Sequence, residues 1–286
     1  MPIFAFVSGY GLFFKYQESK TNYTKSNRIR IRSLFINYWI VLVLFVVVLG
    51  YLLNMPGYPG DFQTFILNFT AVKVSYNGAW WFLTTYLLFV ITSSFWFRLL
   101  LKLNPYLYFF LLLMFYVIGF YFRTYKTDLF SSGYMEWLHT QSALYFCTLF
   151  QFMLGAFVLK YRIHSQISGK IKALPFKNYF LIFGIVLLVV LHGLLPNFFF
   201  APFIAIVFIL LYCQLNITPF LQKGIDFFTP HATNMWLVHM FFYLIYFKEF
   251  VYSFKYVVPI FIVLVGLSVA SSYIINFINK KAQQII

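Results

Sequence analysis

The sequence predicts an all-α integral membrane protein, a single bundle of about nine helices that cross a bilayer. Composition is the first observation, since 62% of the 286 residues are hydrophobic and 9% are charged. The second is that polar residues gather in short runs between apolar stretches long enough to cross hydrocarbon. Such stretches form helices, because an unpaired backbone amide in lipid costs several kcal/mol. We expect one polytopic domain over residues 1–286 and no separate soluble module.

Nine apolar segments follow one another along the chain, with no internal repeat. They lie at 1–14, 33–53, 78–98, 105–122, 142–160, 178–195, 197–214, 231–247 and 256–276. The first begins at Met1 and reaches Lys15 after only 14 residues. Because the positive charges follow this segment and no small-residue cleavage site appears, a signal peptide is not indicated. A short helix and a chain that lacks an upstream helix are both consistent with this start.

The lysines and arginines predict the orientation of the bundle. Alternate loops, beginning with the run from Lys15 to Arg32, carry 16 basic residues, and the opposite loops carry 5. Since cytoplasmic loops are enriched in Lys and Arg, the amino terminus is expected outside and the carboxyl terminus in the cytoplasm. The formal net charge of +15 is therefore assigned to a cytoplasmic face against anionic headgroups, and not to a nucleic-acid partner.

Neither the cysteines nor the histidines predict a disulfide or a metal site. Cys147 and Cys213 both fall within predicted spans, where a buried thiol packs as a small apolar group. The histidines show no i, i+4 pair and no Cys or acidic partner at ligand spacing. They are His139, His164, His192, His231 and His239.

Five local patterns occur in order along the chain, at spacings that match successive helices. They are the Phe-rich residues 3–12 with Ser-Gly-Tyr-Gly-Leu, the basic stretch 28–39, the Trp-rich stretch 79–86, the Gly-containing stretch 151–157, and Asn-Met-Trp-Leu-Val-His at 234–239. Together they resemble the membrane-bound acyltransferase type 3 family, including its fucose O-acetylase-like branch. The similarity covers residues 2–275.

The resemblance implies ten helices with both termini in the cytoplasm. Nine helices that start outside would be that architecture without its first helix. In the family this helix carries an Arg and a later His regarded as catalytic, so the expected general base would lie outside the chain. Two further departures are Tyr86, where many relatives have Glu, and Asn37, where the fucose O-acetylase-like branch tends to have Pro.

The resemblance also implies a function. It predicts an acyltransferase of the plasma membrane, in bacteria the cytoplasmic membrane, that moves an acetyl group from cytoplasmic acetyl-coenzyme A to a sugar hydroxyl of a cell-surface polysaccharide. Acetyl-coenzyme A is then a substrate, no bound cofactor is expected, and the partners are the lipid bilayer and the glycan. Two other hypotheses are a polysaccharide polymerase or flippase component, although the longest outer loop runs only over 54–77, and an inactive, N-terminally truncated acyltransferase.

Arg28, Arg30 and Arg32 are the candidate donor site on the predicted cytoplasmic face. Coenzyme A carries a pyrophosphate and a 3′-phosphate, which guanidinium groups bind with fork geometry. In a helix Arg28 and Arg32 share one side and Arg30 points away, whereas an extended chain would align all three. The alternative is an ordinary positive-inside anchor.

His239 is the candidate catalytic residue, because its segment rises from Thr229-Pro230 and places it near mid-bilayer. A histidine there can position an acceptor hydroxyl or take its proton. The alternative is an interhelical hydrogen bond that fixes packing. His231, eight residues earlier, is expected at the cytoplasmic interface.

Trp81, Thr85 and Tyr86 are the candidate acceptor site, since aromatic faces suit sugar rings and the turn that carries them is polar. Threonine-rich turns in membrane helices also serve as packing contacts, and this alternative stays open. Ser8 and Gly9 are expected to allow close approach of another helix.

Overall fold

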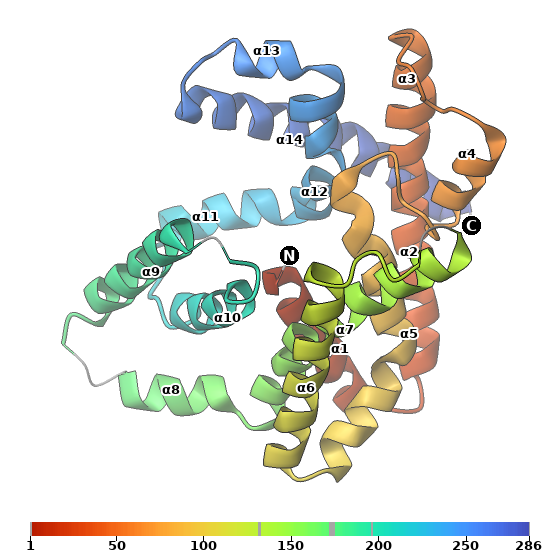
Figure 1. Cartoon of the computed structure of the whole chain (residues 1–286). Coiled ribbons are helices and arrows are strands. Elements are labelled where there is room, and N and C mark those ends of the chain that lie inside the picture. Colours follow the sequence, from red (N-terminus) through yellow and green to blue (C-terminus); the bar gives the residue numbers. More distant parts are fainter. Residues whose placement is uncertain (1, 131–132, 172–174, 196, 286) are drawn as a thin grey trace. The chain divides into compact units, whose positions relative to one another are not determined.

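The computed structural model is all-helical and describes residues 2–130, 133–171, 175–195 and 197–285 (Figure 1). No strand occurs within those ranges. The chain divides into two compact units, one of Met1–Lys25 with Thr85–Ile217 and one of Ser26–Thr84 with Thr218–Ile286. We call them unit 1 and unit 2 and describe each by itself.

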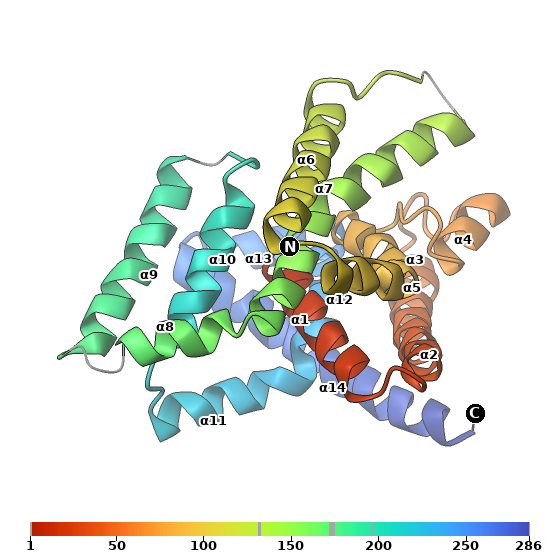
Figure 2. The ribbon, with the colours of Figure 1, turned by 90° about the horizontal axis from the view of Figure 1, so that it is seen from below.

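Unit 1 contains the helices of the chain's start and middle. They are α1 (Pro2–Glu18), most of α5 (Trp81–Lys102), α6 (Pro105–Thr124), α7 (Tyr134–Lys160), α8 (Ile163–Ile171), α9 (Lys177–Leu194) and α10 (Ala201–Tyr212). Helix α7 lies against α1 and α6, and α9 lies against α10, as Figures 1 and 2 both show.

Unit 2 combines an early helical hairpin with the end of the chain. Its helices are most of α2 (Tyr23–Val41), η1 (Leu42–Val48), α3 (Leu49–Leu52), α4 (Phe62–Phe69), η2 (Gly78–Trp80), α11 (Pro219–Phe228), η3 (Thr229–His231), α12 (Ala232–Met240), η4 (Phe241–Tyr246), α13 (Lys248–Tyr252) and α14 (Val257–Ile285). Helices η1 and η4 are π-helical, and η2 and η3 are 3₁₀ turns.

Six helices in the described part of the chain are long and apolar enough to cross a membrane. They are Tyr23–Leu52, Gly78–Lys102, Pro105–Thr124, Tyr134–Lys160, Lys177–Leu194 and Val257–Gln284. Each matches one of the nine predicted segments, and the chain is accordingly a membrane protein.

The other three predicted segments are helical but too short to count as single spans. Helix α1 has 17 residues and α10 has 12. The segment 231–247 is divided among η3, α12 and η4. The structure therefore supports six spans, and a count of nine is not supported.

Side-chain caps explain where several of these helices begin. Asn104 accepts a hydrogen bond from the Tyr106 amide at 2.9 Å, with Pro105 in the first helical position of α6. Asp61 accepts from the amide of Thr64 at 2.8 Å and from its hydroxyl at 2.6 Å at the start of α4. These two bonds hold the pKa of the Asp61 carboxyl below its usual range.

Small residues bring the backbones of unit 1 into contact. A Cβ atom at Gly9 would overlap the carbonyl oxygen of Phe152, and one at Gly155 would overlap the carbonyl oxygen of Phe6. Helices α1 and α7 therefore touch backbone to backbone, which confirms the predicted close approach at Gly9. Gly119 does the same for α6, where a Cβ would lie 2.6 Å from the amide nitrogen of Cys147.

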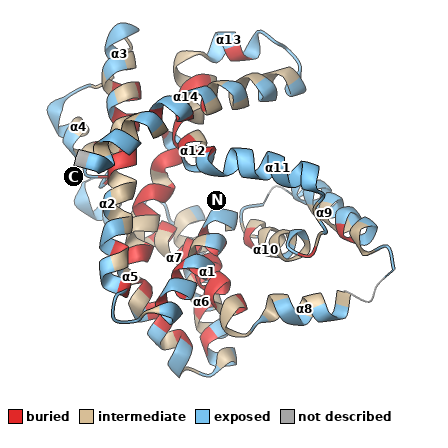
Figure 3. Cartoon of the chain, turned by 180° about the vertical axis from the view of Figure 1, so that it is seen from behind, coloured by how far each residue is buried: buried red, intermediate tan, exposed pale blue. Residues whose placement is uncertain are grey.

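Aromatic rings fill the space around this contact. Phe97 packs against Phe13 with ring centroids 5.1 Å apart and against Phe152 at 6.1 Å. The Tyr23 hydroxyl lies 2.7 Å from Ser93 Oγ in the same core, so its polar end has a partner. Figure 3 shows buried positions in red on both α1 and α7.

Candidate functional site

The three candidate arginines lie on α2, and the helical alternative is the one that the structure has. Arg28 and Arg32 are exposed and share one side of the helix. Arg30 is half-buried, and its Nη1 donates to Asn27 Oδ1 at 2.9 Å. Two of the three guanidinium groups are thus presented together to solvent.

A small pocket of about 250 Å³ lies beside Arg32, between α2 and the end of α14. It is lined by Ile29, Arg32, Ser33, Ile36 and Gln283. Gln283 Nε2 donates to Ser33 Oγ at 3.2 Å across it. The volume is below that of a whole small-molecule site, so the pocket suits one polar group of a larger ligand.

A network of amides and hydroxyls continues from this pocket into the interior of unit 2. Asn279 Nδ2 donates to Asn37 Oδ1 at 3.0 Å, and Asn37 Nδ2 donates to Asn234 Oδ1 at 2.7 Å. Asn234 Nδ2 then donates to Asn276 Oδ1 at 2.8 Å and to Ser272 Oγ at 2.9 Å. Three helices, α2, α12 and α14, are joined by side chains whose polar groups pair with one another.

His231 belongs to this network, although the sequence placed it at the interface. Its side chain is only 4% exposed, and Nδ1 lies 2.9 Å from Ser272 Oγ. The ring also packs against Tyr273, with centroids 4.5 Å apart. The 3₁₀ turn η3 and α14 cover the ring, and its depth at the cytoplasmic interface stays a prediction.

Asn234 is expected to be the member of the network with the largest effect on stability. Asn234→Ala removes the acceptor of Asn37 Nδ2 inside the unit, and an unsatisfied buried group costs about 1–3 kcal/mol, while Ser272 keeps its contact with His231. The midpoint of thermal unfolding in detergent should fall clearly. Gln283→Ala, at the exposed end of the same network, should change it little, and equal shifts for the two variants would contradict the assignment.

His239 lies in the last turn of α12 and is half-buried. Its Nδ1 is 2.8 Å from the carbonyl oxygen of Trp236, an atom that only accepts hydrogen bonds. Nδ1 therefore carries the proton, and in the neutral ring Nε2 holds the free lone pair. This bond lies within the residue's own helix, so among the described residues the interhelical alternative for His239 has no hydrogen-bonding partner.

The backbone next to His239 is held by the side chains of the last residue of η2 and of its N-cap. The carbonyl oxygen of Leu237 accepts from Asn77 Nδ2 at 3.1 Å and from Trp80 Nε1 at 2.9 Å. The amide of Phe241, its ordinary helical partner, instead bonds back to Val238 and His239, and η4 begins there. Single π-turns of this kind mark functional sites in many proteins.

The predicted acceptor residues share α5 but differ in accessibility. Thr85 is completely buried, whereas Trp81 and Tyr86 are half-buried. Trp81 belongs to unit 2, and Thr85 and Tyr86 belong to unit 1. Thr85 is therefore closed to a sugar, and the role of the group as an acceptor site stays a prediction.

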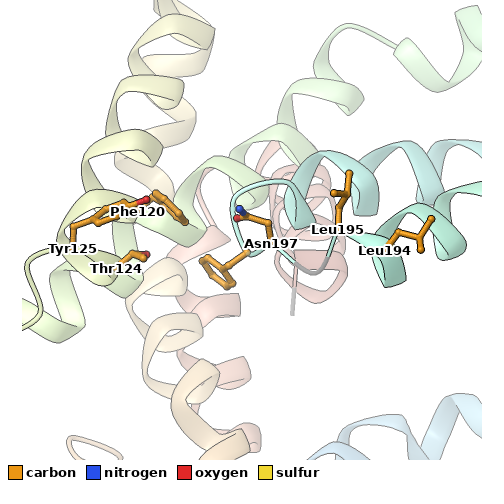
Figure 4. A pocket seen from close by; sticks show the side chains of 7 residues that line it. Phe120, Thr124, Tyr125, Leu194, Leu195 and Asn197 are labelled. Atoms are coloured by element: carbon orange, nitrogen blue, oxygen red, sulfur yellow. The ribbon is translucent and has the colours of Figure 1, made fainter.

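A second hollow, of about 420 Å³, lies in unit 1, and sequence reasoning missed it (Figure 4). It is lined by Phe120, Thr124, Tyr125, Leu194, Leu195, Asn197 and Phe198, from the end of α6 and the region between α9 and α10. The Arg123 guanidinium lies over the Phe198 ring, 4.2 Å from its centroid. The spacing of aromatic residues on α6 was the one signal of this hollow in the sequence. The same spacing is equally typical of helices whose aromatic side chains pack in a core.

The cysteines are unpaired thiols, and only one is buried. Cys147 lies in the core of unit 1, but Cys213 is exposed, so its predicted burial is wrong. Helix α10 ends at Tyr212, which leaves Cys213 as the C-cap outside the packed part of the helix. Within the described ranges, no three His, Cys, Asp or Glu side chains gather as metal ligands.

The model of an acyltransferase domain matches the chain over residues 1–277. The chain belongs to the acyltransferase type 3 family. The resemblance seen in the five local patterns is thereby confirmed, and the acyltransferase domain covers all six spans except the end of α14. No curated protein and no solved structure matched this acyltransferase.

Proposed function

We propose that this acyltransferase moves an acetyl group from acetyl-coenzyme A to a sugar hydroxyl of a cell-surface polysaccharide, as in the fucose O-acetylase-like branch. Arg28 and Arg32 bind the phosphates of the donor, and His239 serves the reaction. The membrane is the plasma membrane, with the arginine-bearing end of α2 and the carboxyl terminus on the cytoplasmic side. The 16 to 5 division of basic residues between the two sides supports this orientation.

The observation that carries the proposal is that the segment with the arginines and the segment with His239 run parallel to each other. Asn37 pairs with Asn234, and further along the same two segments Phe45 stacks on Phe241 at 5.0 Å. The continuous segments α2–η1 and α12–η4 therefore run in the same direction. The positions of their residues along this shared direction can be compared.

Arg32 and His239 lie at opposite ends of this aligned stretch. Arg32 is five residues before Asn37, and His239 is five residues after Asn234. At 1.5 Å per residue the two levels are about 15 Å apart along the helices. A donor with its phosphates at the membrane face and a long arm to its thioester suits such a separation.

The reaction at the far end needs a base that takes the proton of the acceptor hydroxyl. The acceptor oxygen attacks the thioester carbonyl, a C–O bond forms, and the C–S bond breaks as the thiolate leaves. The proton of the acceptor hydroxyl passes to Nε2 of His239, which returns it to the thiolate. The bond from Nδ1 to Trp236 holds the ring in the tautomer that this role requires.

The donor site is tested by binding of labelled acetyl-coenzyme A to purified protein. Arg28→Ala and Arg32→Ala should each weaken binding by about tenfold or more, since a hydrogen bond to a charged group contributes about 1.5–3 kcal/mol. Arg30→Ala is the matched control on the same helix, because Asn27 already holds its guanidinium, and it should have a smaller effect. Unchanged affinity in the double variant Arg28→Ala, Arg32→Ala would remove the donor-site assignment.

A further inference from the structure

Helix α11, Pro219–Phe228, makes no packed core of its own. None of its ten residues is buried, and Figure 3 shows the helix in the exposed colour along its length. Phe220 is 83% exposed and Leu221 is 57% exposed. A water-exposed helix with this many large apolar side chains needs another surface to cover them.

The residues of α11 divide cleanly between two faces. Its polar residues Gln222, Lys223 and Asp226 fall within an arc of about 100°, and its large apolar residues fill about 160° on the other side at 100° per residue. The apolar residues are Phe220, Leu221, Ile225, Phe227 and Phe228. Helix α11 is therefore strongly amphipathic, with one polar face and one apolar face.

Two side-chain hydrogen bonds pair polar groups at the start of α11 and on its polar face. Thr218 caps the first turn through the amide of Leu221 at 3.4 Å, with Pro219 in the first helical position. Gln222 Nε2 donates to Asp226 Oδ1 at 2.8 Å on the polar face. On the apolar face, Phe227 contacts the rings of Phe228 and His231, and all five apolar side chains stay exposed.

We infer that α11 lies flat in the interface of the bilayer, with its apolar face in the boundary between headgroups and acyl chains. Ten residues are half the about 20 that a span requires, so α11 cannot cross the membrane. The six spans of the same chain hold it against a lipid surface. Lys223 and Asp226 cancel in charge, so apolar burial and not attraction to anionic headgroups holds the helix there.

The interfacial position of α11 bears on the segment that carries the two histidines. Helix α11 continues without a break into η3 and α12, which carry His231 and His239. A helix fixed at the interface sets the depth at which this segment begins. The membrane thereby positions the histidine-bearing segment, and this role rests on the proposed function while the lipid contact itself does not.

Spin labelling tests the lipid contact directly. In a Cys147→Ser, Cys213→Ser background, single cysteines replace Leu221, Gln222, Ile225 or Asp226, and each is labelled with a nitroxide. The full chain is reconstituted in phosphatidylcholine vesicles, and collisions with oxygen and with a neutral nickel chelate are measured. All four positions are exposed, so the labels do not disturb a core, and a monodisperse elution profile checks folding.

The inference predicts a several-fold preference for oxygen over the nickel chelate at Leu221 and Ile225, and the reverse at Gln222 and Asp226. Adding anionic lipid should leave the pattern unchanged. Nickel access at all four positions would show a helix in water, and protection of Leu221 and Ile225 from both reagents would show a protein partner. Either result overturns the inference, and neither depends on whether the chain transfers acetyl groups.

Discussion

Replacing His239 by Gln is expected to lower the rate of acyl transfer by about 10²–10⁴-fold, the usual contribution of a general base. Glutamine retains a polar side chain of similar size but cannot take a proton from the acceptor. Binding of acetyl-coenzyme A should be unchanged, because the arginines proposed to hold the donor lie at the other end of the aligned stretch. Transfer of labelled acetyl to glycan, with binding measured on the same preparation, separates the two effects.

His231→Gln is the matched control, since His231 lies on the same stretch of chain but binds Ser272 within the amide network. This variant should unfold at a lower temperature while the folded fraction keeps its rate. If His231→Gln lost as much activity per folded molecule as His239→Gln, the special role of His239 would be wrong.

Gly155→Val is expected to prevent unit 1 from assembling. The new side chain would overlap the backbone of α1 at Phe6, and a backbone obstacle cannot rotate away as a side chain can. The cost should exceed the about 1–3 kcal/mol of ordinary overpacking. Little folded protein should be recovered from membranes by size-exclusion chromatography in detergent.

Gly11→Ala is the control for this prediction. Gly11 is on α1, two residues from the contact at Gly9, but a Cβ there would have nothing within 4 Å. The yield of this variant should match that of the unchanged chain. A normal yield of Gly155→Val would contradict the backbone contact between α1 and α7.

Hydropathy located the helices better than it counted the spans. Six long apolar segments became continuous helices, although Tyr23–Leu52 includes the π-helical η1. The segment at 231–247 is helical but changes type at η4, beside the Leu237 carbonyl that accepts from the side chains of Asn77 and Trp80, which are distant in sequence. A composition window cannot register a contact of that kind.

The shared exposure of Arg28 and Arg32 was predictable, because spacing on one helix decides which side chains lie on the same side, and their role as a donor site stays a prediction. The amide network was not predicted, although part of its signal was present. Ser272, Asn276, Asn279 and Gln283 recur at helical spacing on α14 and form a polar stripe on an otherwise apolar helix. Their partners Asn37 and Asn234 come from helices far away in the chain, and only the fold brings them together.

The tautomer of His239 also could not be predicted from the sequence. The residue was chosen for its depth in the segment, but the availability of Nε2 follows from the bond between Nδ1 and the Trp236 carbonyl. Family membership, by contrast, was visible in five weak patterns because their order along the chain carries more information than any one of them.

The central claim, that this acyltransferase places acetyl groups on a cell-surface polysaccharide, has one direct test. Cells that express the chain are supplied with labelled acetate, the surface polysaccharide is isolated, and label released by mild base is measured as O-acetyl ester. The account predicts base-labile label that is lost when His239→Gln is expressed at the same level. Unlabelled polysaccharide in cells where the folded, donor-binding protein is present would contradict it.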